Sequence, residues 1–440
     1  MESKLETKQH GRPPLPVAFH YGWIVLAVAF LTSLTGAGIR SAAQVFIVSL
    51  ESEFGWSRSE IASAVAVSLF LFGVAGPISG WLLDRFGPRR VMMCALAVLC
   101  AGLTGTTVMQ QLWQFALLWG IFVGFGAGGI ATVLAASLVH RWFVARRGIA
   151  LGLLNSASST GQLIFIPLLM AVVVTAGWRA GSLLLAGTSI GLIALIAFLM
   201  RDDPSEVGLE PYGSDFEASS DLMAPLRGAP GTPSSVRVTD AFKSRTFWLL
   251  CGIFFVCGGT ANGLIGTHLI PHAVDRGISQ VTAAATVGVM GGMNFVGTLT
   301  SGWLTDRVDN RKLLAAVFAL RGAALFLLPF ANDFSGLFVF AVIYGLDWYA
   351  TVSPVIALTG DTFGKQAIGR IFGWIFLSHQ IGAAFSATGA AALFQYFGDY
   401  QSAFFTGGIM GMMAALMALS IKPQQPSIPI EPEPTGLARA

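Results

Sequence analysis

The fold is decided by a charged stretch that follows a long apolar run: Ser79-Gly80-Trp81-Leu82-Leu83-Asp84-Arg85-Phe86-Gly87-Pro88-Arg89-Arg90. The stretch recurs about half a chain length later as Ser301-Gly302-Trp303-Leu304-Thr305-Asp306-Arg307-Val308-Asp309-Asn310-Arg311-Lys312. Both copies match Gly-x-x-x-Asp-Arg-x-x-x-Arg-(Arg/Lys), and each lies between apolar segments. A charged hairpin repeated at this distance predicts two related halves, arranged in parallel around a central site.

The composition indicates a protein that is surrounded by lipid. Hydrophobic residues make up 54% of the chain and charged residues only 11%, whereas a soluble domain has about 25% charged residues. A soluble protein of 440 residues with this composition would lack a polar surface. We therefore predict that most of the surface faces a lipid bilayer.

Twelve apolar segments, each of roughly 20–30 residues, are long enough to cross the hydrocarbon core. They lie at 22–50, 59–83, 89–109, 112–138, 148–175, 180–200, 246–273, 280–305, 312–331, 335–360, 370–396 and 401–421. The sequence thus predicts an all-α membrane protein with two pseudo-symmetric bundles of six helices, at 21–200 and 245–421. Because the number of spans is even, both chain ends are expected on one side.

The basic residues predict which side that is. All but five of the 26 lysines and arginines lie in the tails or in the loops on the same side as the tails. The exceptions are Arg58, Arg179 and Arg276 in the opposite loops, and Arg40 and Arg321 within spans. Loops rich in lysine and arginine face the cytoplasm. We therefore expect a multi-pass protein of the cell (inner) membrane with both termini cytoplasmic.

Three polar segments flank the bundles. The tail at 1–20 is polar and contains proline, and no cleavable signal is visible in it, so 22–50 should remain as the first helix. Residues 201–244 are predicted to form a flexible cytoplasmic linker, and 422–440 a cytoplasmic tail. The cysteines Cys94, Cys100, Cys251 and Cys257 fall within spans without a zinc-ligand pattern, which predicts core thiols, no metal site and no cofactor.

The hairpin motif allows two interpretations. Its charges lie at the inner boundary of the membrane, where ion pairs would hold one closed state and release in another. Equally, they would only anchor the topology. The candidate latch residues are Asp84, Arg85, Arg89 and Arg90 in the first copy, and Asp306, Arg307 and Arg311 in the second.

The motif resembles the loop signature of the major facilitator superfamily, and the resemblance extends over essentially the whole chain. The first copy matches closely, whereas the second has Asp309 where a glycine is expected. The resemblance implies a fold of twelve helices in which helices 1, 4, 7 and 10 line a central cavity, and a protein that usually works as a monomer.

Other stretches are similar to the monocarboxylate and oxalate/formate transporter branch. They are Tyr21-Gly22-Trp23, Phe54-Gly55-Trp56-Ser57-Arg58, Arg141-Trp142-Phe143, Arg146-Arg147-Gly148 and Asp203-Pro204 through Gly208. The resemblance implies that a basic residue in the outer part of helix 1 is functional, and Arg40 lies at the matching position. The branch's arginine in helix 8 is absent, with Asn294 and Thr298 in that region. A lysine that the oxalate group has in helix 11 is also absent, and His379 and Gln380 lie near its position.

Ionisable residues within spans cost about 2.5–3.5 kcal/mol each on insertion scales, so each one needs a reason. Arg40 lies roughly 25 Å along its helix from Trp23. Its planar guanidinium suits a carboxylate, and we predict that it contacts a small organic anion. Alternatively, the side chain extends outward to the membrane interface.

The other intramembrane groups are candidates for substrate binding or proton transfer. His268 and His272 share a helix face and are predicted to couple transport to protons, although the interface also explains His272. Asp347, followed by Trp348, is predicted to carry a proton or to contact substrate, the alternative being a permanent ion pair with Arg40 or Arg321. His379 and Gln380 are predicted to bind either substrate or a neighbouring helix.

Together these features predict a secondary active transporter rather than an enzyme, because no nucleophile–base or metal cluster is present in the sequence. The predicted cargo is a small organic anion, specifically a monocarboxylate, moved by alternating access in symport with protons. The alternative is a proton-driven exporter of drugs or other hydrophobic compounds, although the Gly-x-x-x-Gly-Pro element common in helix 5 of such exporters is absent. The expected partners are the substrate, protons and the lipid bilayer, with no nucleic acid.

Overall fold

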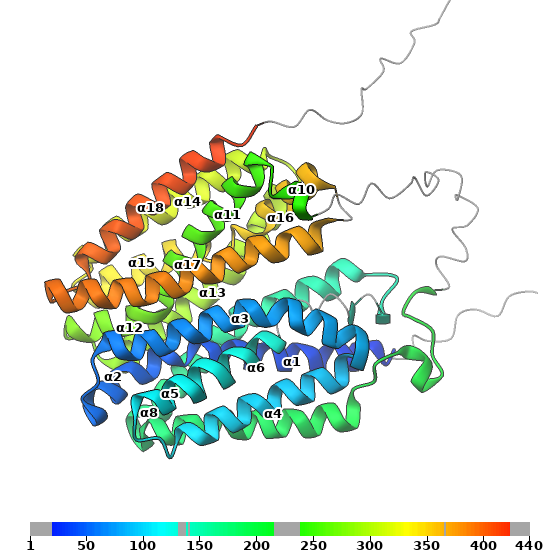
Figure 1. Ribbon diagram of the computed structural model, residues 1–440, viewed down its shortest axis with the longest axis horizontal. Helices are drawn as coiled ribbons and strands as arrows, with labels where there is room; N and C mark the ends of the chain where they lie inside the picture. The colour runs from blue at the N-terminus through cyan, green and yellow to red at the C-terminus, as the bar shows by residue number, and fades with distance from the viewer. Residues whose placement is uncertain (1–19, 131–137, 140, 215–237, 365–366, 423–440) are drawn as a thin grey trace, which may run out of the picture.

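A computed structural model of the chain describes residues 20–130, 138–139, 141–214, 238–364 and 367–422. Within these ranges it does not describe the side chains of Pro77, Gly80, Asp84, Arg147, Gly148, Asn155 and Ser158. The described chain is built from helices, several of which run the full length of the molecule (Figure 1).

The first half contains spans one to six. Its elements are α1 (Gly22–Ser41), α2 (Ala43–Phe54), α3 (Arg58–Phe86), α4 (Pro88–Thr106), α5 (Leu112–Phe115), the π-helix η1 (Ala116–Val123), α6 (Gly124–Gly129) and α8 (Arg147–Leu199). α1 and α2 form one span with a break at Ala42, and α8 is two spans that meet at Gly177. Gly177 has a φ of 83°, a conformation that glycine adopts without steric penalty.

The second half contains spans seven to twelve, preceded by two short helices, η2 (Pro204–Val207) and α10 (Val238–Ala241). Its elements are α11 (Arg245–Gly258), the π-helix η4 (Gly259–Ile265), α12 (Gly266–Asp275), α13 (Gln280–Thr305), α14 (Asn310–Leu327), η5 (Leu328–Phe330), α15 (Phe334–Asp347), α16 (Val352–Phe363), α17 (Ile368–Phe397) and α18 (Gln401–Leu419). α11, η4 and α12 form one span, as do α15 and α16. The prediction of twelve spans is confirmed.

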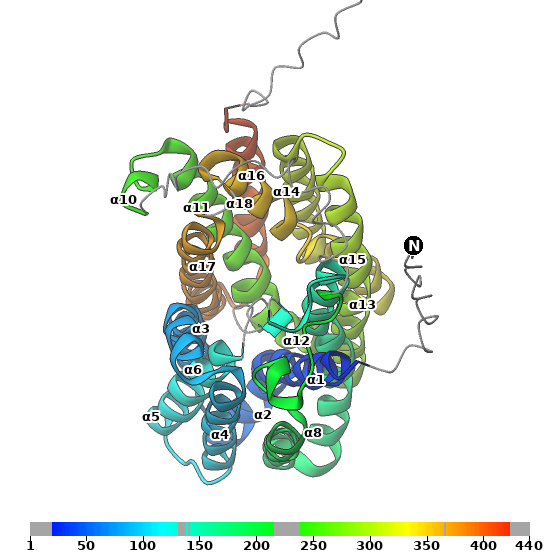
Figure 2. The same ribbon diagram turned by 90° about the vertical axis from the view of Figure 1, so that its right-hand side faces the viewer.

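The helices of the two halves form two groups that lie against each other (Figure 2). α3 packs on α17, and α8 packs on α13. These contacts are close because glycines lie at the crossings: a Cβ on Gly291 would come within 2.8 Å of the Leu163 backbone nitrogen. In a membrane, such backbone-to-backbone packing replaces hydrophobic exclusion as the force that holds helices together.

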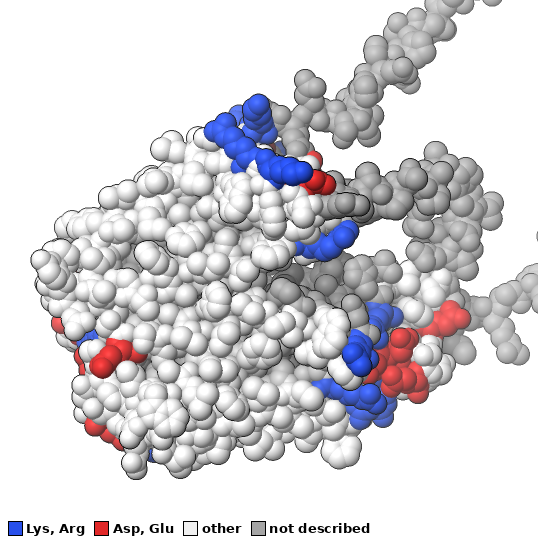
Figure 3. Space-filling model, in the orientation of Figure 1, with Lys and Arg blue, Asp and Glu red and all other residues white. Residues whose placement is uncertain are grey.

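The surface has the composition expected in lipid. Large apolar side chains point outward along the helices, including Trp81, Phe198, Phe385 and Leu416. Lysines and arginines visible on one face gather at the right-hand end of the molecule (Figure 3). α1 begins and α18 ends toward that same end (Figure 1). The described chain is therefore a multi-pass membrane protein whose basic residues are concentrated at one end.

Candidate functional site

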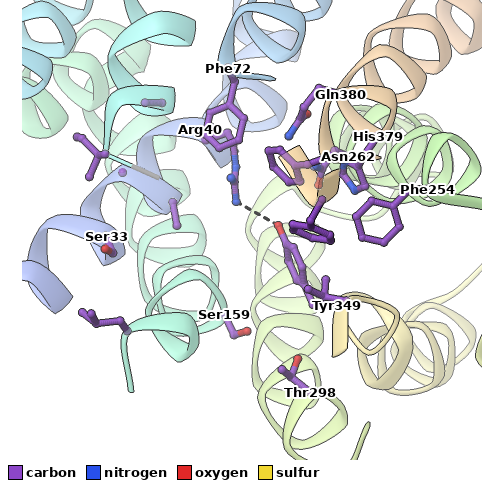
Figure 4. A pocket seen from close by; sticks show the side chains of 18 of the residues that line it. Ser33, Arg40, Phe72, Ser159, Phe254, Asn262, Thr298, Tyr349, His379 and Gln380 are labelled. Carbon is purple, nitrogen blue, oxygen red and sulfur yellow. Dashed lines mark hydrogen bonds between the residues drawn. The ribbon is translucent and has the colours of Figure 1, made fainter. Parts of the chain in front are cut away.

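A cavity of about 250 Å³ lies between the two halves. The first half contributes residues of α1, α3, α6 and α8, and the second contributes residues of α11, η4, α13, α16 and α17 together with the turn that follows α15. Its polar lining side chains are Ser33, Arg40, Ser159, Asn262, Thr298, Tyr349, Ser353, His379 and Gln380. Four phenylalanines, Phe72, Phe254, Phe372 and Phe376, also line the cavity. Phe72 and Phe254 are labelled in Figure 4.

Arg40 lies near the end of α1 and projects into this cavity (Figure 4). Its Nη2 donates a hydrogen bond of 3.2 Å to the hydroxyl oxygen of Tyr349, which belongs to the other half. The guanidinium also lies over the ring of Phe72, 5.0 Å from its centroid. Among the described residues, Arg40 has no carboxylate within ion-pair distance. It is therefore a fixed positive charge beside an internal cavity.

His379 and Gln380 of α17 face Arg40 across the cavity (Figure 4). The His379 ring stacks on Phe376, with the ring centroids 5.6 Å apart, and packs against Phe254. Both residues are buried, and neither His379 Nδ1 nor Gln380 Oε1 has a hydrogen-bond partner in the part of the chain that is described. Buried polar atoms of this kind are available to a ligand.

Sequence reasoning missed a polar network that crosses the cavity wall. Asn294 Nδ2 donates to Ser159 Oγ at 2.8 Å, which joins α13 to α8 of the other half. Asn294 Oδ1 accepts from the backbone nitrogen of Tyr349 at 3.1 Å and from Thr298 Oγ1 at 3.2 Å. The network occupies the region in which the sequence lacks the expected arginine of helix 8. The sequence contained a signal for this network, because Asn294 and Thr298 are polar residues within an apolar span, where polar side chains need partners.

Asp347 does not line the cavity. It forms a fully buried ion pair with Arg321 of α14, whose Nε donates to Asp347 Oδ2 at 2.6 Å. Arg321 Nη2 also donates to the carbonyl oxygens of Asp347 and Trp348, each at 3.0 Å. Arg321 therefore fixes the turn between α15 and α16, the turn that carries Tyr349. The structure shows one of the two arrangements that the sequence allowed, the ion pair with Arg321.

His268 and His272 lie on α12, away from the cavity lining. His268 Nε2 is 2.8 Å from the Ala387 carbonyl oxygen, so this nitrogen carries the donated hydrogen. Its Nδ1 then accepts from the Tyr400 hydroxyl at 3.1 Å, which describes a neutral imidazole with both nitrogens paired. His272 packs edge-on against Phe404, with the ring centroids 4.8 Å apart. The structure does not bring either histidine to Arg40.

A further contact between the halves lies at the left-hand end of Figure 1, where α2 and α12 are neighbours. Arg58 at the start of α3 donates from Nη2 to Asp275 Oδ1 at 2.7 Å, and its Nε donates to Glu51 at 3.0 Å. The guanidinium lies 4.4 Å from the ring centroid of Phe394. The Arg58 side chain is only 8% exposed, so this ion pair closes the two halves against each other at that end.

The hairpin residues make their described contacts within their own half. The Arg89 backbone nitrogen donates to Asp202 Oδ1 at 2.6 Å, and Arg311 Nη1 donates to the Ile421 carbonyl oxygen at 2.9 Å. Hydrogen bonds from Arg311 hold the pKa of the Asp309 carboxyl below its ordinary value.

The other members of the motif add no contact between the halves among the described residues. Arg85 lies over the rings of Trp81 and Phe86, and Arg307 over that of Trp303. The side chains of Arg90 and Asp306 form no hydrogen bond or ion pair with the described residues. The Asp84 side chain lies outside the described residues.

Two six-helix groups around a central cavity with a polar lining define a membrane carrier. The model of the Major Facilitator Superfamily matches residues 25–387 and 293–439, and the chain belongs to this superfamily. It is a membrane transporter and not an enzyme.

The chain is similar to several curated transporters. It is 25% identical to an uncharacterized MFS-type transporter, YcxA, of Bacillus subtilis, covering 84% of this chain and 88% of that one. Monocarboxylate transporter 11 of Homo sapiens is 26% identical over 96% of this chain and 87% of its own. The oxalate:formate antiporter of Oxalobacter formigenes is 24% identical over 91% and 92%, respectively. These relatives confirm the resemblance that the sequence motifs indicated.

Among solved structures, a D-xylose-proton symporter superposes with a TM-score of 0.72 at 15% identity, covering 92% of this chain and 98% of that one. At an identity this low, the similarity is evidence for the fold alone. This superposition and the superfamily match together confirm the predicted fold.

Proposed function

We propose that this transporter moves a small organic anion, a monocarboxylate, by alternating access, with Arg40 holding the carboxylate. The observation that carries the proposal is the position of Arg40: a guanidinium in an internal cavity with no carboxylate partner among the described residues. A planar guanidinium binds a carboxylate with two parallel hydrogen bonds, and it remains charged at any physiological pH. The names of the monocarboxylate and oxalate:formate relatives support the same class of cargo.

The cavity size and lining suit a short anion. A volume of about 250 Å³ is at the small end for a ligand pocket. Gln380 and His379 supply hydrogen-bonding groups opposite Arg40, and the phenylalanine walls accept an alkyl chain. The carboxylate therefore binds at the guanidinium, and the remainder of the anion packs on the aromatic rings.

The conformation corresponds to a carrier closed at its outer end. The Arg58–Asp275 pair joins the halves there, while the cavity lining extends from Arg40 to Leu154 and Ile356, toward the basic end. With that basic end in the cytoplasm, both termini are cytoplasmic and the cavity belongs to the inward-facing state. The carrier acts as a monomer in the cell membrane.

Coupling to protons is part of the proposal. An anion that enters with a proton is carried without net charge, so a pH gradient drives its uptake. His379 is the one imidazole among the residues that line the cavity, and the described lining contains no carboxylate. Three further candidates for proton transfer do not line the cavity: Asp347, His268 and His272. A proton that they carry would follow a path separate from the cavity.

A thermal-shift screen of the purified carrier against carboxylates and cationic drugs, over a range of pH, tests the class of cargo. We expect stabilisation by short monocarboxylates and none by cationic drugs. The four phenylalanines of the wall favour the second candidate, an exporter of hydrophobic compounds. Stabilisation by drugs alone would support that candidate and remove the anion proposal.

In liposomes, addition of the stabilising anion should cause proton uptake. Anion flux that is insensitive to collapse of the proton gradient would remove the coupling but not the choice of cargo.

A further inference from the structure

The Arg58 side chain reaches across the boundary into a group of residues of the second half. Its Nη1 donates to Asp275 Oδ2, and its Nη2 donates to Asp275 Oδ1 at 2.7 Å. The central carbon of the guanidinium lies 4.4 Å from the ring centroid of Phe394 and 5.9 Å from that of Tyr400. We call the three second-half residues, Asp275, Phe394 and Tyr400, the outer socket.

The outer socket is assembled by three elements of one half. Asp275 ends α12, Phe394 lies near the end of α17 and Tyr400 directly precedes α18, and these ends meet at the left-hand end of Figure 1. The rings of Phe394 and Tyr400 stack, with their centroids 4.6 Å apart. The Tyr400 hydroxyl donates to His268 Nδ1 at 3.1 Å, and His268 is held in turn by the Ala387 carbonyl oxygen. The aromatic wall is therefore positioned by its own half and does not depend on Arg58.

A carboxylate beside the faces of two aromatic rings attracts a cation. A guanidinium suits it best, because its fork pairs with the carboxylate while its weakly hydrated plane lies over a ring. Among the described residues, Asp275 has no ion-pair partner other than Arg58. When the halves separate at this end, Arg58 leaves with the first half and the Asp275 carboxylate loses its counter-charge. The Asp275 side chain is 31% exposed even in the closed state, so an ion from solution reaches it.

We propose that the outer socket is a cation-binding site at the outer end of the carrier. Arg58 fills it while that end is closed, and an organic cation that bears a guanidinium group fills it from outside when the end opens. The bound cation keeps Arg58 away from Asp275, so it holds the carrier open toward the outside and slows transport. None of the socket residues lines the central cavity. The inference uses the proposed orientation of the carrier but is independent of its cargo.

The test measures how fast an external reagent reaches a cysteine placed behind the outer socket. Ala43 is buried at the start of α2, between Arg40 and Glu51 along the first span. Ala43→Cys in an otherwise cysteine-free, full-length carrier therefore reports opening at this end, and we call this variant the reporter. Right-side-out membrane vesicles are treated with a membrane-impermeant methanethiosulfonate reagent, and the labelled fraction of the carrier is measured after purification. The readout requires no cargo.

In the reporter, Arg58→Ala vacates the outer socket. We expect labelling at least about tenfold faster than in the reporter alone, because a buried charge pair between the halves is lost. Ethylguanidinium replaces the atoms that the substitution removes. Glu51, which accepts from Arg58 Nε at 3.0 Å, remains to pair with this cation from the first half. Ethylguanidinium should therefore return the labelling rate to nearly that of the reporter alone, whereas sodium chloride at the same concentration should not.

With Arg58 in place, the same cation should act in the opposite direction. Ethylguanidinium then competes with a tethered guanidinium, whose effective concentration is in the millimolar range. Cation concentrations comparable with this value should raise the labelling rate of the reporter about twofold. Opposite effects of one cation on the two proteins are expected only if both guanidinium groups occupy the same site.

Arg179→Ala in the reporter is the matched control. Arg179 pairs with Glu53 at 2.6 Å and lies over the ring of Trp178, 4.6 Å from its centroid. All three residues belong to the first half, so this variant should respond to ethylguanidinium as the reporter does.

Phe394→Leu tests the aromatic wall. Added to Arg58→Ala, it should raise the concentration of ethylguanidinium needed for half-maximal closure about fivefold, because a cation–π contact is lost.

Two outcomes in Arg58→Ala would overturn the outer socket: labelling no faster than in the reporter alone, or fast labelling that ethylguanidinium slows no more than sodium chloride does. Closure by ethylguanidinium that is undiminished when Asp275→Asn and Phe394→Leu are both added would overturn it as well. If Arg58→Ala does not reach the membrane, the reporter alone decides, and a labelling rate that ethylguanidinium leaves unchanged would overturn the site.

Discussion

The guanidinium of Arg40 and the hydroxyl of Tyr349 meet at 3.2 Å across the boundary between the two halves of the carrier. Arg40 comes from the first span and Tyr349 from the turn in the tenth, so the contact spans most of the chain. The contact places the positive charge of Arg40 at the boundary, where side chains of both halves surround it. The affinity of a ligand that binds Arg40 therefore depends on how the two halves are positioned. Alternating access requires such a difference in affinity between the two states.

Tyr349→Phe removes the hydroxyl but keeps the ring. We expect the affinity for a short carboxylate to fall about fivefold, because Arg40 loses the group that orients it and net hydrogen bonds contribute about 1 kcal/mol. The measurement is a calorimetric titration of the variant. Tyr344→Phe is the control. The Tyr344 hydroxyl donates a hydrogen bond of 2.9 Å to the Thr260 carbonyl oxygen, and Tyr344 does not line the cavity. A higher affinity in Tyr349→Phe would mean that Tyr349 competes with the ligand for Arg40.

The Arg321–Asp347 pair should stabilise the fold rather than carry protons. Removing one partner, as in Arg321→Met or Asp347→Asn, leaves a buried charge or an unpaired polar group, and we expect a loss of about 3–5 kcal/mol in the free energy of unfolding. The combined Arg321→Met, Asp347→Leu variant should recover most of that loss. Denaturant unfolding in detergent measures all three.

Proton uptake into liposomes separates the two roles of Asp347. The combined variant should retain substrate-driven proton uptake if the pair is structural. A variant that folds and transports the anion, but takes up no protons, would instead restore the original prediction that Asp347 is a proton carrier.

Much of the fold could be predicted from the sequence, because the thickness of the bilayer sets the length of each span and the membrane restricts basic residues to the loops of one side. The apolar spans, the repeated hairpin and the break between residues 175 and 180 all have local signals, and the structure places that break at Gly177. Arg40 was also predictable, since a charge within a span needs a reason and its neighbourhood resembles a known branch. Arg40 lies in the lining of the cavity, and its role there stays a prediction.

The helix faces could not be predicted in the same way. Asp347 and Tyr349 are two positions apart, yet one pairs with Arg321 and the other contacts Arg40. This difference is set by the turn after α15, which depends on hydrogen bonds from α14, a distant segment of the chain. His268 was likewise assigned to the cavity helix by its position, but its partners Ala387 and Tyr400 hold it elsewhere.

The Arg58–Asp275 pair should open whenever the outer end opens. In a cysteine-free background, Arg58→Cys combined with Asp275→Cys should be joined by a short bifunctional methanethiosulfonate reagent, and this cross-link should stop transport and be reversed by reductant. Each single cysteine variant should transport whether or not the reagent is present. Continued transport by the fully cross-linked protein would show that the halves do not separate at this end.

The most direct test of the central claim is uptake of a radiolabelled short monocarboxylate by liposomes that contain either the wild type or Arg40→Gln. Arg276→Gln serves as the control, because it removes the same charge from a partly exposed arginine that lies outside the cavity lining. We predict uptake by the wild type and by Arg276→Gln, and a loss of at least about tenfold in Arg40→Gln, as expected for a charge-assisted hydrogen bond. Undiminished uptake by Arg40→Gln would contradict the assignment of Arg40 as the carboxylate-binding residue.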